Sequence, residues 1–123
     1  MLANPYQKYQ HNQVETSTPE KLLLMLYNGA LKFIRGAREA VAQRDIEKAN
    51  NRINRVQDII FELMSSLNFE QGEIAKNLYA LYDYMNKRLM EANVKKDDEI
   101  LKEVEGMLES LRDTWKEAII NNN

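Results

Sequence analysis

The segment that decides the fold is STPEKLLLMLYNGALKFIRGAREAV, residues 17–41. Ser17 or Thr18 can cap a helix at its start, and Pro19 suits the first helical turn. Because successive side chains lie about 100° apart around a helix axis, one broad face collects the apolar positions. These positions are Leu23, Leu26, Tyr27, Ala30, Phe33, Ile34, Ala37 and Val41. The segment therefore predicts an amphipathic helix that ends near Gln43.

This helix contains more apolar residues than a single buried face needs. Leu22 to Tyr27 form an unbroken run of apolar and aromatic side chains. A membrane-spanning helix needs about 20 mostly apolar residues, and Asn28 and Lys32 interrupt this run too early. We therefore predict no direct insertion into a membrane, and a helix that is apolar on more than one side.

Three further segments show the same helical period. Asp45 can cap a second helix, whose apolar stripe is Ile46, Ala49, Ile53, Val56, Ile60, Leu63, Met64 and Leu67. After the break NFEQG near Asn68, the third stripe is Ile74, Leu78, Leu81, Tyr82, Met85, Leu89 and Ala92. After the break NVKKD, Asp97 or Asp98 can cap a fourth helix. Its stripe is Ile100, Leu101, Val104, Met107, Leu108, Leu111, Trp115, Ala118 and Ile119.

Four amphipathic helices joined by short connections predict an all-α fold. Helices of roughly 20–25 residues are roughly 30–37 Å long, and short connections make consecutive helices antiparallel neighbours. We expect one antiparallel four-helix bundle domain over residues 18–120. Residues 1–17 are polar with scattered aromatic side chains and no sustained period, which predicts a short, partly ordered N-terminal arm.

Composition narrows the class of protein. The 123 residues include no cysteine, which excludes disulfides and thiolate chemistry and fits a reducing compartment. The formal net charge is −2, with 17 basic and 19 acidic residues mixed along the chain, so no basic footprint for nucleic acid is present. The N-terminal stretch lacks the basic start and apolar core of a secretory signal. We expect a soluble intracellular protein that does not bind nucleic acid.

The residues that enzymes of this architecture use are missing. A di-iron bundle needs inward-facing glutamate and histidine side chains, but the single histidine, His11, lies in the arm. None of the four apolar stripes contains an acidic or basic residue, so no buried carboxylate pair is placed for acid–base catalysis. No glycine-rich phosphate loop occurs. We therefore predict no catalytic, cofactor-binding or metal site.

Surplus apolar and small residues lie off the predicted core faces. On the first helix, Met25 points about 160° from the core direction and shares an outer strip with Gly29 and Gly36. Such glycines can simply be tolerated on an exposed helix, or they can allow another backbone to approach closely. Off-stripe side chains on the second and third helices are Ile59, Phe61, Tyr79, Tyr84 and Met90.

Each off-stripe residue alone is explained by a wider core face, but together they predict apolar grooves between helices. Amphipathic partner segments dock into such grooves, and Met and Tyr suit an adaptable contact surface. Lys48, Arg52 and Arg55 form a basic stripe on the second helix. This stripe is either solvated or a contact for acidic groups or for the C-terminus of a partner helix.

Four stretches of the chain together resemble the flagellar export chaperone family FliS. They are NPYQKYQHNQVETSTPEKLLLMLYNGALKFI, ANNRINRVQDIIFELMSSLNF, NLYALYDYMNKRLMEAN and LRDTW. The resemblance covers essentially the whole chain in order. It implies a cytoplasmic four-helix bundle that binds the disordered C-terminal segment of flagellin. It also implies that the chaperone prevents early polymerisation and presents the client to a component of the flagellar export gate. Dimers occur in the family.

The resemblance also implies that the arm covers part of an apolar groove when flagellin is absent. Tyr6, Tyr9 and Val14 would then be the apolar anchors of the arm. The predicted client-binding or arm-covered residues are Tyr6, Tyr9, Val14, Met25, Gly29, Ile59, Phe61, Tyr79, Tyr82 and Met90. Two other functions remain open at this point: a homo-oligomeric structural or adaptor protein whose apolar flanks bury one another, and a small helical enzyme.

Overall fold

A computed structural model describes residues 18–121 of the chain. In this part of the chain the elements are α2 (Pro19–Ala42), α3 (Ile46–Ser65), the 3₁₀ turn η1 (Phe69–Gln71), α4 (Glu73–Lys95) and α5 (Asp98–Asn121). No strand occurs among them, so the predicted all-α fold is confirmed. The predicted arm over residues 1–17, with Tyr6, Tyr9 and Val14, lies outside the described residues.

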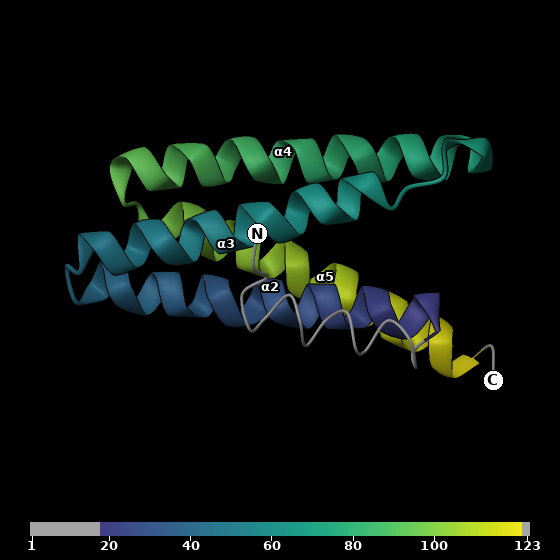
Figure 1. Cartoon of the computed structure of the whole chain (residues 1–123), viewed down its shortest axis with the longest axis horizontal. Helices are drawn as coiled ribbons and strands as arrows, with labels where there is room; N and C mark the ends of the chain where they lie inside the picture. The colour runs from purple at the N-terminus through teal and green to yellow at the C-terminus, as the bar shows by residue number, and fades with distance from the viewer. Residues whose placement is uncertain (1–17, 122–123) are drawn as a thin grey trace, which may run out of the picture.

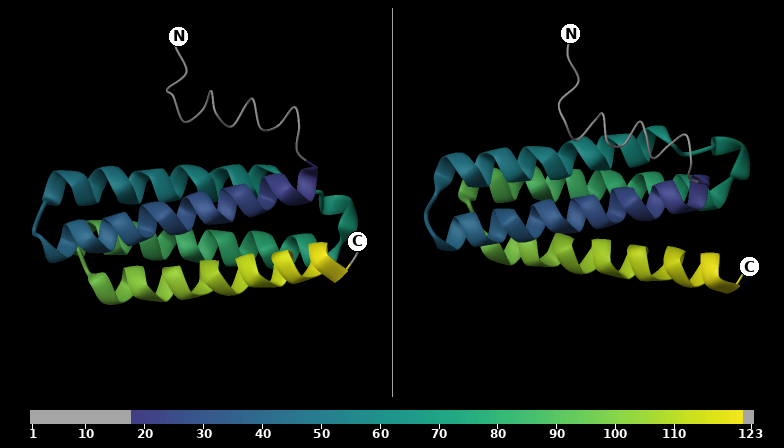
Figure 2. Two further views of the ribbon diagram at one scale, coloured as in Figure 1. Left: turned by 90° about the horizontal axis from the view of Figure 1, so that it is seen from below. Right: turned by 60° about the horizontal axis from the view of Figure 1, so that its bottom comes forward.

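The four helices form an antiparallel bundle along the long axis of the molecule (Figures 1 and 2). α2 packs against α3 and α5, and α4 packs against the same two helices. The apolar stripes meet between the helices in one core that all four share. In the described part of the chain, no helix is both long enough and apolar enough to cross a bilayer.

Local capping explains where the helices begin. The side chain of Thr18 accepts a hydrogen bond from the backbone N–H of Lys21 at 3.2 Å, and Asp45 accepts one from Lys48 at 3.1 Å. Asp97, directly before α5, accepts one from the N–H of Glu99 at 2.9 Å. Each bond satisfies a backbone donor that the helix itself leaves unpaired. Capping by Thr18, Asp45 and Asp97 agrees with the predicted starts.

One end of the bundle, which holds the α2–α3 and α4–α5 turns, is tightly closed. The side chains buried almost completely at this end include three alanines, Ala40, Ala49 and Ala92. Small side chains at these positions let the neighbouring helices approach closely. Ile46 was predicted as a core residue, and this is wrong, since its side chain is exposed. It is the first residue of α3, and Ala49, one turn later, is the first α3 side chain that the neighbouring helices cover.

The opposite end of the bundle is open. In Figure 1 the C-terminal half of α5 diverges from the N-terminal half of α4. Ile74 was predicted as core, but its side chain is 66% exposed. Leu23, Leu78 and Trp115 are only partly buried. The apolar stripes of α2, α4 and α5 therefore extend past the region in which the helices bury one another's side chains.

Candidate functional site

The open end of the bundle contains an apolar cavity of about 310 Å³. It lies where the first turns of α2 and α4, the α3–α4 connection and the last turns of α5 meet. We call it the end groove. Its apolar lining is Pro19, Leu23, Leu67, Ile74, Ala75, Leu78, Tyr82 and Trp115, and its polar lining is Glu20, Ser66, Asn68 and Gln71. Mostly apolar cavities with a few polar groups are typical of binding sites.

A buried pair of tyrosines lies beneath the end groove. The hydroxyl groups of Tyr27 and Tyr82 are 2.5 Å apart, and the two residues are 0% and 1% exposed. Burial raises the pKa of Tyr27, although hydrogen bonds with Tyr82 and Trp115 partly offset that rise. Burial also raises the pKa of Tyr82, and its hydrogen bond with Tyr27 raises it further. Both hydroxyl groups therefore keep their protons at neutral pH. Tyr82, a predicted site residue, is both a core side chain and part of the groove lining.

A second apolar surface follows the boundary between α3 and α4. Gln57 donates a hydrogen bond to Asn86 across this boundary at 2.9 Å, which sets the antiparallel register of the two helices. The α3 and α4 side chains that lie on this side by helical spacing and remain exposed are Ile46, Phe61, Tyr79, Met90 and Val94. The exposed Phe69 of η1 contacts Tyr79 and extends this surface. We call these six residues the α3–α4 strip.

The α3–α4 strip joins the end groove at η1. The rings of Phe69 and Tyr79 are in contact there, with centroids 5.8 Å apart. The structure thus places Phe61, Tyr79 and Met90, three of the predicted site residues, on one exposed face. The end groove and the α3–α4 strip thus meet at this end of the bundle.

The predicted groove residues on the α2 side are less accessible. Met25 and Gly29 are half-buried. Ile59 was predicted to lie outside the core stripe, either in an apolar groove or on a wider core face; it is 4% exposed and belongs to the core, which agrees with the wider face. The side chain of Arg52 packs over Gly36, 3.3 Å from where a Cβ would lie. In this antiparallel register Ile59 lies at the level of Gly29, inside the seam between α2 and α3.

The basic stripe on α3 has no acidic partner in the part of the chain that the structure describes. Arg52 donates a hydrogen bond to the neighbouring Asn51 at 2.9 Å. No ion pair joins Lys48, Arg52 or Arg55 to a described carboxylate, although several other basic residues form such pairs. This arrangement favours the interpretation of the stripe as a solvated surface.

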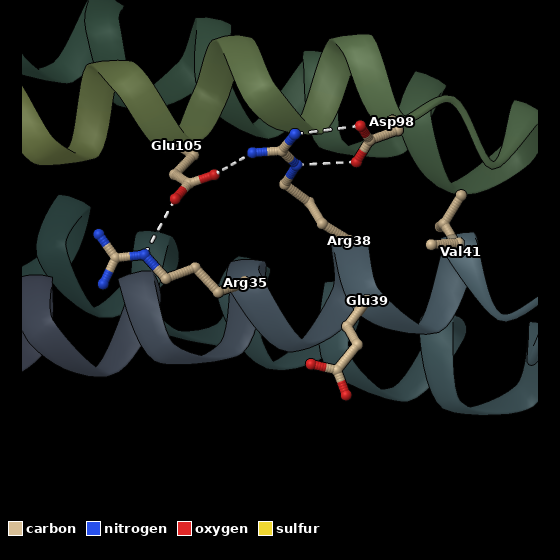
Figure 3. Close-up of a pocket in the computed structure, with 7 residues that line it drawn as sticks. Arg35, Arg38, Glu39, Val41, Asp98 and Glu105 are labelled. Atoms are coloured by element: carbon tan, nitrogen blue, oxygen red, sulfur yellow. Dashed lines mark hydrogen bonds and ion pairs between the residues drawn. The ribbon is translucent and has the colours of Figure 1, made fainter.

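A second cavity, of about 370 Å³, lies between α2 and α5 and is lined mainly by charged residues (Figure 3). Arg38 reaches from α2 to bind both oxygens of Asp98 at 2.8 and 3.1 Å. It also donates to Glu105 at 2.6 Å. Arg35 donates to the other oxygen of Glu105 at 2.9 Å and to Glu109 at 2.8 Å. These charges satisfy one another, so the network joins α2 to α5 and leaves no charged group of its own free for a ligand.

This network predicts a loss of stability in acid. Burial alone would raise the pKa of Glu105, whose side chain is 13% exposed, but hydrogen bonds from Arg38 and Arg35 lower it overall. The hydrogen bond from Arg38 likewise lowers the pKa of Asp98. Folded-state pKa values below the ordinary ones stabilise the protein above about pH 4–5. That contribution disappears as the pH falls through the folded-state values.

The expected result is that an Arg38→Met variant loses about 1 kcal/mol of unfolding free energy at pH 7, because the pairs are partly exposed to solvent. Its stability should also fall less than that of wild type between pH 5 and pH 3. Urea titrations at the two pH values measure both effects. Arg112→Met is the control, since among the described residues Arg112 pairs only with the adjacent, exposed Asp113. Equal acid sensitivity of wild type and Arg38→Met would contradict the assignment.

The described residues offer no metal-binding group of histidine, cysteine, aspartate or glutamate side chains. Within the same part of the chain no charged side chain is buried in the core. The exposed side chains of the end groove and the α3–α4 strip are mainly apolar, so these surfaces can bind a partner through apolar contact.

Comparison with known proteins gives consistent matches along the chain. Residues 2–122 match the family model described as "Flagellar protein FliS". The flagellar secretion chaperone FliS of Bacillus subtilis is 48% identical over 118 residues, which cover 96% of this chain and 88% of that protein. The protein of the same name from Campylobacter jejuni is 34% identical and covers 96% of this chain and 91% of its own length.

A solved structure shares the fold. It is titled "Crystal structure of flagellar chaperone from bacteria", and it superposes with a TM-score of 0.79 over 94% of this chain and 95% of its own. The sequence identity is 21%, so this likeness bears on the arrangement of the helices alone.

Proposed function

Because the chain belongs to the FliS family, we propose that it binds the disordered C-terminal segment of flagellin on the end groove and the α3–α4 strip. The family is one of flagellar secretion chaperones and not of enzymes, so the chain is a flagellar secretion chaperone. In this proposal it acts in the cytoplasm, where it prevents premature polymerisation of flagellin. It then delivers the segment to a component of the export gate.

The observation that carries the proposal is the uncovered apolar surface at the open end. The described helices leave Ile74 exposed and Leu78 and Trp115 only partly buried there. Exposed aromatic side chains of α3, η1 and α4 continue the surface. Contiguous apolar patches on a folded protein are typical of interaction sites. From Ile46 to Phe61 the strip extends about 22 Å along α3, enough for about four turns of a partner helix.

The chemistry of this surface suits a segment that is disordered before it binds. Such a segment loses about 2–5 kcal/mol or more through ordering. It recovers this only by burying a large apolar area, at about 25 cal/mol per Å². An amphipathic helix on the α3–α4 strip, continued by apolar side chains in the end groove, would provide such an area.

Calorimetric titration with a peptide of the flagellin C-terminal segment tests the proposal. We expect binding with a clearly negative heat-capacity change, because apolar surface is buried. Raising the salt concentration should change the affinity little, since the net charge of the chaperone is only −2. Circular dichroism should show that the peptide gains helix on binding. Binding that lacks a heat-capacity change and disappears in moderate salt would be electrostatic and would contradict the apolar mechanism.

The same exposed strip also fits a second function, that of a homo-oligomeric adaptor, because two copies could bury their α3–α4 strips against each other. Light scattering with and without the flagellin peptide separates the two functions. A monomer, or a homodimer that binds the peptide without losing this surface, supports the chaperone function. An oligomer that excludes the peptide supports the adaptor.

A further inference from the structure

The hydroxyl groups of Tyr27 and Tyr82 offer two hydrogen-bond donors, but the described core provides an acceptor for only one of them. Each tyrosine has one O–H donor, and the two groups share a single hydrogen bond. Each hydroxyl oxygen therefore takes part in one hydrogen bond, either as donor or as acceptor. The hydroxyl group that accepts this bond still has its own proton, and that proton has no acceptor among the described residues. Leaving a buried donor unpaired is unfavourable, so this proton needs an acceptor from outside the pair.

Trp115 does not supply that acceptor. Its indole N–H is a donor only, so it cannot take a proton from either hydroxyl group. In one of the two possible orders Tyr27 donates to Tyr82, and Tyr82 keeps the proton that is left over. Tyr82 lines the end groove, whereas Tyr27 does not. The unused proton in this order therefore belongs to the side chain that borders the cavity.

The lining of the end groove indicates which acceptor fits. Among the described residues that line it, Glu20 is the only charged one, and none is a lysine or arginine. A carboxylate or phosphate would enter an apolar cavity without a cation to pair with, which is costly. A neutral carbonyl oxygen needs no such partner, and an apolar peptide segment brings one with every residue. The cavity, at about 310 Å³, is large enough for ordered water to take this place before a peptide binds.

We infer that the Tyr82 hydroxyl is a specificity-determining contact, which donates a hydrogen bond to a neutral carbonyl oxygen of the apolar peptide segment bound in the end groove. The identity of that peptide as flagellin rests on the proposed function. In a mostly apolar cavity, this hydrogen bond would fix which residue of the bound segment lies beside Tyr82. With Tyr27 donating to Tyr82 and Tyr82 donating to the peptide, neither hydroxyl group of the pair is left with an unpaired proton.

A matched pair of variants tests this contact. In Tyr82→Phe the donor to the peptide is lost, so we expect affinity for the flagellin peptide to fall about 3- to 10-fold. In Tyr27→Phe the Tyr82 hydroxyl remains and can still donate to the peptide, so affinity should change less than about 2-fold. Titrations can use the emission of Trp115, because it is the only tryptophan in the chain and it lines the groove.

A structural role alone would affect both variants, since each breaks the same Tyr27–Tyr82 bond. Equal affinity of Tyr82→Phe and wild type, or an equal loss in both variants, would overturn the inference and leave the proposed function standing. Absence of any binding by wild type would overturn the proposed function. If Tyr82→Phe does not fold, proton NMR of the wild-type complex replaces it. A slowly exchanging tyrosine hydroxyl proton close to peptide protons supports the inference, and a hydroxyl that exchanges as fast as in the free protein contradicts it.

A second peptide identifies the source of the carbonyl oxygen. In this peptide every asparagine and glutamine is replaced by leucine. If Tyr82→Phe still weakens binding, the acceptor is a backbone carbonyl. If the difference between wild type and Tyr82→Phe disappears while the peptide still binds, the acceptor is a side-chain amide. Either result supports a neutral carbonyl.

Discussion

An Ile59→Glu variant is expected to lose most of its folded population. The Ile59 side chain is 4% exposed and packs in the core seam between α2 and α3. Removing a buried isoleucine costs about 2–5 kcal/mol, and an unpaired carboxylate in the same place adds several kcal/mol. A small domain has a total stability of only about 5–15 kcal/mol. Urea denaturation followed by circular dichroism should show little or no native baseline at pH 7.

The matched control is Phe61→Glu, two residues further along the same helix. Phe61 is 51% exposed on the α3–α4 strip, so the same new charge stays in water. Its unfolding free energy should remain within about 0.5–1 kcal/mol of wild type. Equal stability of the two variants would show that the α2–α3 seam is open to solvent, and that Ile59 belongs to the surface, as helical spacing alone suggested.

The contrast between Ile59 and Phe61 shows what helical spacing can predict. Spacing gives the direction of a side chain relative to its own helix, and Phe61 does lie off the core. It does not give the distance to the neighbouring helix. Ile59 lies at the level of Gly29 in the antiparallel register, and it is buried in the shared core. The positions of glycine on one helix and isoleucine on another become related only once the register is known.

Ile74 shows the opposite case. Its predicted direction, toward the bundle axis, is consistent with its place in the end groove, but none of the described helices covers it there. The apolar stripes predict four helices and their inward faces, and the capping residues Thr18 and Asp45 agree with their starts. The angles between the helix axes decide at which end the helices pack closely and at which end they diverge. The apolar stripe of one helix gives no information about these angles.

The polar contacts between helices could not be predicted at all. Arg38 and Glu105 are 67 positions apart, and Tyr27 and Tyr82 are 55 apart. Each of these residues has an ordinary local pattern: the arginine and the glutamate look like solvated charges, and the tyrosines look like core residues. A pairing of this kind arises from the register of antiparallel neighbours, so sequence spacing within one helix gives no signal for it.

The other large effect is expected at the end groove. An Ile74→Glu variant should bind the flagellin peptide about 10- to 100-fold more weakly than wild type. Burying an isoleucine side chain contributes about 1.5–3 kcal/mol, which corresponds to roughly this range of affinity, and a carboxylate facing an apolar peptide opposes binding further. Because Ile74 is 66% exposed, the free protein should keep its unfolding free energy within about 0.5 kcal/mol.

Ile120→Glu is the control for this measurement. Ile120 is 64% exposed on α5 and is not part of the lining of the end groove, so it adds the same charge at similar exposure. Its affinity should match that of wild type. An equal loss in both variants would mean that net charge, and not the groove, controls binding. If Ile74→Glu binds like wild type while Phe61→Glu does not, flagellin uses the α3–α4 strip alone. The end groove would then need another occupant, because Ile74, Leu78 and Trp115 would remain uncovered in the complex.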